Sequence, residues 1–336
     1  MTAVVRSLRL VALALVAVLV AAGPAAAARH APKPQPKPNP NAGIVNIYTT
    51  LGYQNASAAG TGMIVDASGE VLTNNHVIRG ATTFRVVEVS TKRTFTATVV
   101  GYSVSQDVAV LQISPAKNLP IIVRGNSAKL KVGQPVVARG NAGGRGGATP
   151  AKGAITGLHQ QIVASDDEGG TETLTNLVET NAGIEPGDSG GPLFNAAGRA
   201  IGMITAGTTS FRFQSQASRG YAIPINKAMS VVRSIEKGVS TDSVHVGPTS
   251  FLGVSIQDVL GGAQVQAVVG SSAAAGAGLE QGDVITSLDG TPVTSSDDLQ
   301  SVVLSLVPGT AVPIEWTDTA GTAHTGQITP VAGPPQ

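Results

Sequence analysis

The sequence has no cysteine, few aromatic residues and few charges. Among its 336 residues none is Cys, 3% are aromatic and 13% are charged. The absence of cysteine excludes disulfides and thiolate metal sites, so packing and hydrogen bonds must provide the stability. Low charge together with 41 glycines is typical of a loop-rich β protein rather than a helical one. The length predicts roughly two or three domains with buried cores.

Positive charge is scarce outside the N-terminal segment. The formal net charge is +1, but the first 40 residues carry five basic residues and no acidic one. The rest of the chain has 17 basic and 21 acidic residues, a net charge of −4. Because residues 41–336 are mildly acidic overall and show no cluster of basic residues, the composition argues against nucleic acid as a partner.

The N-terminus carries the long apolar run of this chain. Arg6 and Arg9 precede an apolar stretch from Leu10 to Ala22, and Ala25 to Ala28 offers a small-residue cleavage site. This pattern predicts a signal peptide over 1–28 and a secreted protein, extracellular or in the cell envelope. An uncleaved anchor remains open, because the run approaches the length that spans a membrane. Both interpretations predict export.

The rest of the sequence divides into two modules and two linkers. Alternating prolines within 29–41 predict an extended Pro-rich linker. Residues 42–238 contain short apolar segments separated by turns, which is typical of a barrel or sandwich, and end in a helix expected over 226–237. Residues 239–250 read as a polar linker. Residues 251–333 mix strands with a helix and predict a small α+β domain.

The clearest chemical signal is the run GDSGGP at 187–192. Its glycines permit a tight turn in which a serine hydroxyl lies beside backbone N–H groups able to hold an oxyanion. His76, within TNNHV, and Asp107, within QDVAV, precede Ser189 in the chain. The order His, Asp, Ser is that of chymotrypsin-type triads and differs from the hydrolase and subtilisin orders.

Each member of this predicted catalytic triad has a role. Ser189 is the nucleophile, His76 takes its proton and later passes it to the leaving amine, and Asp107 orients the imidazole. Among the five histidines, His159 is the one alternative to His76, but it follows Asp107 in the chain, which breaks the order.

These motifs resemble those of the trypsin-like superfamily, and are nearest to its HtrA/DegP branch. The C-terminal module resembles a PDZ domain, and the combination is similar to secreted actinobacterial serine proteases with one PDZ domain. The matching segments are TNNHV at 73–77, QDVAVLQI at 106–113, GDSGGPL at 187–193, YAIPIN at 221–226, FLGV at 251–254 and GLEQGDVI at 278–285.

The resemblance implies a mainly β fold, in which a chymotrypsin-like double six-stranded β-barrel precedes a small α+β PDZ domain. His76 and Asp107 would come from the first barrel and Ser189 from the second. It further implies polypeptide substrates and a homo-oligomer, a trimer in this family, with no cofactor and no metal. We expect a secreted serine endopeptidase that acts on unfolded or misfolded proteins. The alternative is a catalytically latent peptide-binding chaperone or scaffold.

The nucleophile turn departs from the family in one residue. We expect Gly187, Asp188 and Ser189 to form the oxyanion hole, with the N–H groups of Gly187 and Ser189 as donors. HtrA proteins usually carry Asn where this chain has Asp188, whereas digestive proteases carry Asp and pair it with a newly cleaved N-terminus. Ile44-Val45 superficially resembles such a terminus, but the branch resembled does not use that activation.

Substrate specificity is expected to depend on Gly183, six residues before the serine. In the family this position lies at the base of the first specificity pocket, and without an acid there a Lys or Arg side chain finds no partner. Small or medium aliphatic residues are therefore predicted before the scissile bond. Ile204, Thr205 and Ala206 are expected to form the pocket wall and to pair with the substrate backbone.

The PDZ-like module predicts a second peptide site. Leu252, Gly253 and Val254 would present backbone N–H groups to a peptide C-terminal carboxylate, and Ile256 would line the groove beside it. An inert packing domain is the alternative.

Two further segments are weaker signals. The run at 139–147 lacks the ending of a phosphate loop and is expected to join two strands of the second barrel. The acidic run at 165–170 is expected to be a solvated loop rather than a calcium site, because its ligand spacing matches no calcium loop.

Overall fold

The computed structural model describes residues 39–165, 171–205 and 219–336. The predicted signal peptide, most of the Pro-rich linker, the acidic residues at 166–170 and Ala206 lie outside the described residues. Within the described ranges, no helix has the length and apolar character needed to cross a membrane.

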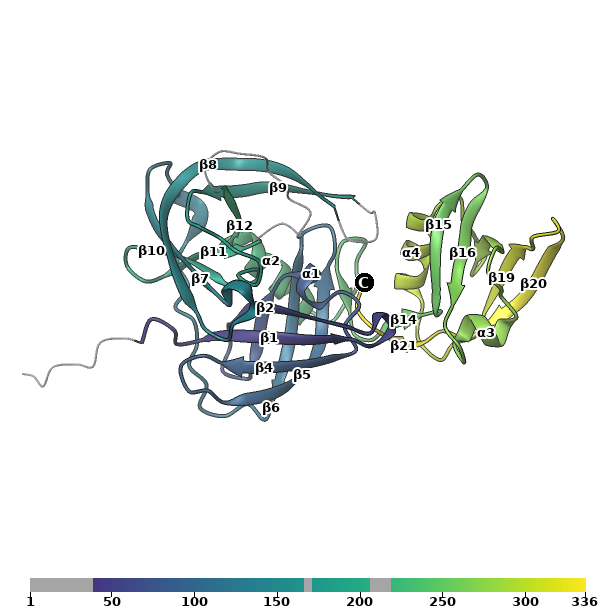
Figure 1. Ribbon diagram of the computed structural model, residues 1–336, viewed down its shortest axis with the longest axis horizontal. Helices are drawn as coiled ribbons and strands as arrows, with labels where there is room; N and C mark the ends of the chain where they lie inside the picture. The colour runs from purple at the N-terminus through teal and green to yellow at the C-terminus, as the bar shows by residue number, and fades with distance from the viewer. Residues whose placement is uncertain (1–38, 166–170, 206–218) are drawn as a thin grey trace, which may run out of the picture. The chain divides into compact units, whose positions relative to one another are not determined.

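The first half of the structure is an antiparallel six-stranded barrel (Figure 1). Its strands follow the order β5-β4-β1-β2-β3-β6, and pairing of β5 with β6 closes it. Apolar side chains of these strands form a buried cluster that fills the interior. The strands are β1 (Ile44–Leu51), β2 (Ala56–Ile64), β3 (Glu70–Thr73), β4 (Thr83–Glu88), β5 (Thr94–Ser103) and β6 (Val108–Ser114).

The second half is a closed barrel with the strand order β10-β11-β12-β9-β8-β7. Its two long strands, β8 and β9, are mostly polar, and they contain no long apolar run from which a strand could be predicted. The predicted double six-stranded barrel is confirmed. The strands are β7 (Pro135–Gly140), β8 (Thr149–Ser165), β9 (Thr171–Thr180), β10 (Pro192–Asn195), β11 (Ala200–Ile204) and β12 (Gly220–Pro224).

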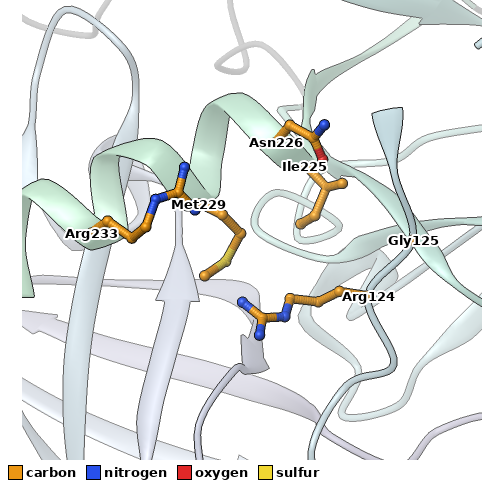
Figure 2. Close-up of a pocket in the computed structure, with 6 residues that line it drawn as sticks. All are labelled: Arg124, Gly125, Ile225, Asn226, Met229 and Arg233. Atoms are coloured by element: carbon orange, nitrogen blue, oxygen red, sulfur yellow. The ribbon is translucent and has the colours of Figure 1, made fainter. Parts of the chain in front are cut away.

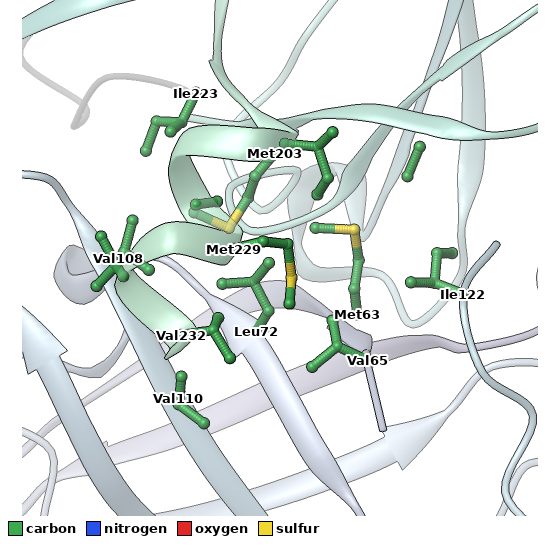
Figure 3. Packing of buried hydrophobic residues seen from close by; sticks show 14 of the residues in the cluster. Met63, Val65, Leu72, Val108, Val110, Ile122, Met203, Ile223, Met229 and Val232 are labelled. Atoms are coloured by element: carbon green, nitrogen blue, oxygen red, sulfur yellow. The ribbon is translucent and has the colours of Figure 1, made fainter. Parts of the chain in front are cut away.

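Helix α2 (Ile225–Glu236) joins the two barrels through a shared apolar core. The helix begins one residue before the predicted range and buries one face. Figure 3 shows side chains of both barrels packing with those of the helix, so the barrels share buried apolar area and hold one another in place. The residues labelled there are Met63, Val65, Leu72, Val108, Val110, Ile122, Met203, Ile223, Met229 and Val232.

The PDZ-like module forms its own sheet and core, as predicted. The sheet order is β15-β16-β17-β19-β20, and Trp316 is buried in the core beneath it. The N-cap of α4 is Ser295, whose side chain accepts from the Asp298 N–H. The elements are β15 (Val254–Val259), β16 (Gly262–Val268), α3 (Ala273–Ala277), β17 (Val284–Leu288), β18 (Thr291–Pro292), α4 (Ser296–Ser305), β19 (Val312–Thr317) and β20 (Ala323–Ile328).

Within the segment expected to be a polar linker, 239–250, two short strands pair with parts of the chain that are distant in the sequence. Strand β13 (His245–Val246) pairs with β5 of the first barrel. Strand β14 (Thr249–Phe251) pairs with β21 (Val331–Gly333) near the other end of the chain. Four short helical turns complete the fold: α1 (Asn75–Ile78), η1 (Gly52–Gln54), η2 (Ser127–Lys129) and η3 (Ala142–Gly144).

Candidate active site

His76 and Asp107 meet on one side of the first barrel. His76 lies on α1, directly after β3, and Asp107 lies in the turn between β5 and β6. The imidazole Nδ1 is 3.0 Å from each carboxylate oxygen of Asp107. The His76 backbone N–H also donates to Asp107 Oδ1, and Asn74 Nδ2 donates to the Asp107 carbonyl. The aspartate therefore holds both the ring and the backbone of the histidine.

Asp107 is buried and has an additional donor from the second barrel. The Thr205 hydroxyl donates to Asp107 Oδ2 at 2.8 Å. Burial alone raises the pKa of Asp107, but the charge of His76 and the hydrogen bonds from His76 and Thr205 outweigh it and lower the pKa. The carboxylate thus stays ionised at neutral pH, the state needed to orient an imidazole and to stabilise its charged form.

The serine turn of the second barrel is bonded directly to the first barrel through Thr61. The Thr61 N–H donates to the Ser189 carbonyl at 2.8 Å, and the Thr61 hydroxyl donates to the Gly187 carbonyl at 2.7 Å. Gly190 adopts a positive φ of 85°, and a Cβ there would collide with the Thr61 carbonyl oxygen. Glycine is needed at this position both for the turn and for the close approach of the two barrels.

A second set of bonds ties the serine turn to Asp107. Gly190 donates to the Ile204 carbonyl and Ile204 donates to the Gly191 carbonyl, both at 2.8 Å. The next residue along the chain is Thr205, the donor to Asp107. Ser189, Asp107 and His76 are therefore linked through hydrogen bonds and adjacent peptide units, although they lie far apart in the sequence. The structure thus connects the Ser189 turn to Asp107 and His76 by way of Ile204 and Thr205.

One residue of the predicted oxyanion hole is not available as a donor. The Asp188 N–H donates to the Glu185 carbonyl at 3.0 Å, so it cannot also face an oxyanion. Gly187 and Ser189 remain the candidate donors. The 139–147 run is an inter-strand loop of the second barrel, as expected, and it supports this turn: Gly143 donates to the Pro186 carbonyl at 2.7 Å.

The Asp188 side chain is a buried carboxyl with no ion pair to a cation among the residues that the structure describes. Its Oδ2 accepts from the Glu185 N–H, whereas Oδ1 is buried and has no hydrogen-bond partner among the described residues. Burial raises the pKa of Asp188 to about 6, and the neighbouring Glu185 charge adds to the effect. Ile44 does not supply a cation, because it begins β1, is fully buried and donates its N–H to the Asn41 carbonyl.

We expect the Asp188→Asn variant to be more stable than the wild type above pH 6 and no more stable near pH 4. Because the pKa of Asp188 is higher in the folded than in the unfolded chain, ionisation destabilises the fold as pH rises toward and beyond 6. The gain at pH 7.5 should be about 1–2 kcal/mol in the free energy of unfolding. Urea unfolding at both pH values measures it, and an equal difference at both would contradict the assignment.

The residues predicted to form the substrate pocket lie in different environments. Gly183 is exposed with open space where a Cβ would lie, so its position permits a pocket base. Ile204 is fully buried, and its backbone N–H and carbonyl bond the serine turn, so it does not pair with a substrate strand. Thr205 is also buried and its hydroxyl holds Asp107, while its place in a pocket wall stays a prediction. Ala206 lies outside the described residues.

The contacts that connect the two barrels at this site escape sequence analysis. Thr61, Asn141 and Thr205 are buried polar residues that connect the two barrels, and Asn141 donates its N–H to the Thr61 hydroxyl at 2.9 Å. Their one signal in the sequence is a polar residue beside apolar strand residues, which is common elsewhere in the chain. His159, the alternative to His76, is exposed on β8, and its Nδ1 contacts the Asn176 side chain.

The predicted PDZ peptide site lies at a sheet edge. β15, which contains Val254 and Ile256, is the outer strand of its sheet, so one side of it is available for an added strand. Gly253 adopts a positive φ of 83°, and a Cβ there would collide with Ser272. Leu252 is buried in the core of the module, which fixes the start of this loop.

A separate pocket of about 360 Å³ lies at the start of α2 (Figure 2). No residue of the predicted active site or of the PDZ peptide site contributes to it. Figure 2 shows two arginine side chains directed toward it beside the methionine. Its lining residues are Arg124, Gly125, Ile225, Asn226, Met229 and Arg233.

The fold and the site together define a trypsin-like domain of two barrels followed by a PDZ domain. Residues 60–203 match the family described as trypsin-like peptidase domain, and residues 250–317 match the PDZ domain family. The structure is similar to the HtrA-type protease AlgW with tripeptide, at a TM-score of 0.51 and 31% sequence identity, covering 88% of this chain and 95% of that one. The chain belongs to the HtrA-like family of serine proteases.

Two curated relatives extend the comparison. Serine protease PepD of Mycobacterium tuberculosis is 33% identical over 304 residues, which covers 85% of this chain and 63% of the relative. Serine protease Do-like HtrA of Lactococcus lactis subsp. cremoris is 34% identical over 266 residues, covering 74% and 65%. The chain therefore spans slightly less than two thirds of the length of these relatives.

Proposed function

We propose that this protein is an exported serine endopeptidase that hydrolyses peptide bonds of unfolded or misfolded polypeptides. The observation that carries the proposal is the continuous hydrogen-bonded path from Thr205 through Asp107 to His76, next to the turn that holds Ser189. Buried polar groups are aligned in this way where a histidine must be kept in one tautomer and orientation.

The proposed reaction proceeds through an acyl-enzyme. His76 accepts the Ser189 proton as the hydroxyl oxygen attacks the substrate carbonyl, and Asp107 stabilises the imidazolium. The N–H groups of Gly187 and Ser189 hold the oxyanion of the tetrahedral intermediate. His76 then protonates the leaving amine, and a water molecule hydrolyses the acyl-enzyme with His76 again as the base.

The partners proposed are polypeptide substrates at the cleft and peptide C-termini at the edge of β15. A peptide that adds to β15 as a strand would place its carboxylate at the loop of Leu252, Gly253 and Val254. Export to the cell envelope or the exterior is proposed from the N-terminal sequence, and trimer formation from the family. Cell fractionation tests the proposed export, and light scattering tests the proposed trimer.

The experiment that tests the proposal is covalent labelling by a fluorophosphonate together with cleavage of unfolded casein. We expect labelling at Ser189 and casein degradation by the wild type, and neither reaction in the Ser189→Ala variant. A folded wild-type chain that shows neither labelling nor cleavage would overturn the proposal in favour of a latent peptide-binding scaffold.

We expect peptides with Val or Ala before the scissile bond to be cleaved about tenfold faster, in kcat/KM, than peptides with Arg. Gly183 offers no charge to a cationic side chain. The Gly183→Asp variant should raise kcat/KM for the Arg peptide by about tenfold or more, and the uncharged Gly183→Asn variant is its matched control. Equal gains for both variants, or a wild-type preference for Arg, would contradict this assignment of the pocket base.

A further inference from the structure

Residues Pro334 to Gln336, which follow β21, are hydrogen-bonded to the helix that carries His76. The Asn75 side-chain Nδ2 donates to the Gln336 carbonyl at 2.9 Å. Just beyond the other end of α1, the Gly80 N–H donates to the Pro335 carbonyl at 2.8 Å. Pro335 is buried, and Asn75 is fully buried. The segment thus contacts the chain on both sides of His76.

Helix α1 depends on such contacts because it is short. It spans four residues, Asn75–Ile78, and its N-cap residue Asn74 makes no side-chain capping bond. A single turn fixes several dihedral angles for one hydrogen bond, so it does not hold its shape without tertiary support. Asp107 supports the helix from one direction, through bonds to Asn74 and His76. Pro334–Gln336 supports it from another.

The segment is itself anchored. The Gln336 N–H donates to the hydroxyl of Tyr102, a fully buried residue of β5, at 3.3 Å. The same hydroxyl is 3.0 Å from Thr249 Oγ1 on β14, the strand that pairs with β21. Gly333 lies so close to Phe251 that a Cβ would collide with its side chain. The path of the segment is therefore fixed just before it reaches α1.

We propose that Pro334–Gln336 acts as a positioning segment for His76, holding α1 in the orientation in which the imidazole can serve Ser189. This inference rests on the proposed function. The bonds of the segment reach Asn75 and Gly80, and none of these groups touches the reacting atoms. Loss of the segment should therefore lower kcat through misplacement of His76 and leave substrate binding nearly unchanged, since small displacements of a catalytic group slow the reaction strongly.

The first test removes residues 334–336 from the full chain. We expect kcat for a peptide substrate to fall by about 10- to 100-fold, with KM within about threefold of wild type. The rate of fluorophosphonate labelling should fall in parallel, and millimolar synthetic peptide VAGPPQ should restore part of both rates. The matched control is Ala332→Ser, an exposed change in β21 that leaves the bonds of 334–336 intact. A kcat equal to that of the wild type would overturn the proposal.

A second variant and an NMR signal distinguish loss of the positioning contacts from unfolding, and they do so without an activity measurement. Gln336→Pro removes the N–H that bonds Tyr102 while keeping the length of the chain. In wild-type protein the His76 Nδ1 proton, held by Asp107 at 3.0 Å, should give a sharp low-field NMR signal, which broadens or disappears in both variants while thermal unfolding stays cooperative. If the wild type shows no proteolysis, the proposed function fails. The NMR signal still tests the positioning role of Pro334–Gln336, because a signal that is unchanged in both variants refutes that role.

Discussion

Replacement of Ser189 by alanine is expected to lower kcat for peptide hydrolysis by about 10⁶-fold, with little change in stability. The hydroxyl is the one group at the turn able to form the acyl-enzyme, and the backbone bonds that hold the turn do not use it. Those bonds run from Thr61 to the Ser189 carbonyl and from Gly190 to Ile204. A small residual rate above that in water should persist, because the oxyanion donors remain.

The measurement is steady-state hydrolysis of a chromogenic peptide with active-site titration, which excludes contaminating protease. Ser243→Ala is the matched control, since it removes the same atom from an exposed serine of the described chain. A Ser189→Ala protein that retains more than about a hundredth of wild-type kcat would assign the nucleophile to another residue.

The Asp107→Asn variant is expected to lose about 10⁴-fold in kcat while keeping its fold. Asp107 accepts hydrogen bonds from the His76 backbone, the His76 ring and the Thr205 hydroxyl. The single oxygen of an asparagine can accept from the His76 backbone at the Oδ1 position. Its NH₂ group then takes the Oδ2 position, where it faces Nδ1 of the ring and can donate to the Thr205 hydroxyl. The imidazole must accept there and carry its proton on Nε2, the atom that should take the proton of Ser189.

The pH profile distinguishes this tautomer effect from simple unfolding. The variant should unfold cooperatively, bind peptide with a KM near that of the wild type, and recover part of its rate at high pH, where hydroxide can replace the general base. Asp242→Asn, at an exposed site, is the control for the chemical change. A kcat within about tenfold of wild type would mean that Asp107 does not orient His76.

The residues proposed to take part directly in the reaction could be predicted from the sequence. The residues that hold them in position could not. Ser189, His76 and Asp107 stand in motifs whose glycines and order reflect the needs of the reaction. Thr205 was expected in a pocket wall, and its hydrogen bond to Asp107 was not foreseen. Thr61 was not predicted at all, because a threonine in a strand looks the same whether it bonds its own barrel or the opposite one.

The same division applies to secondary structure. Strands with apolar runs, such as β1 and β6, are among the short apolar segments on which the prediction of a β fold rested. The long polar strands β8 and β9 were missed, because their conformation comes from pairing with one another and with their neighbours in a closed barrel rather than from local propensity. The strands β13 and β14 at the 239–250 linker were not predicted for the same reason, because they form by pairing with partners distant in the sequence.

The sequence by itself determined the fold class, the family and the identity of the triad candidates, since these depend on local motifs and hydrophobic pattern. The tertiary structure alone decided that the Asp188 N–H is bonded to Glu185, what holds Asp107, and that Pro334–Gln336 lies against the helix of His76. These are hydrogen bonds between groups that are separated along the chain. No local pattern specifies such a bond, because a donor's choice of acceptor is fixed only when packing brings the two together and removes the competing water.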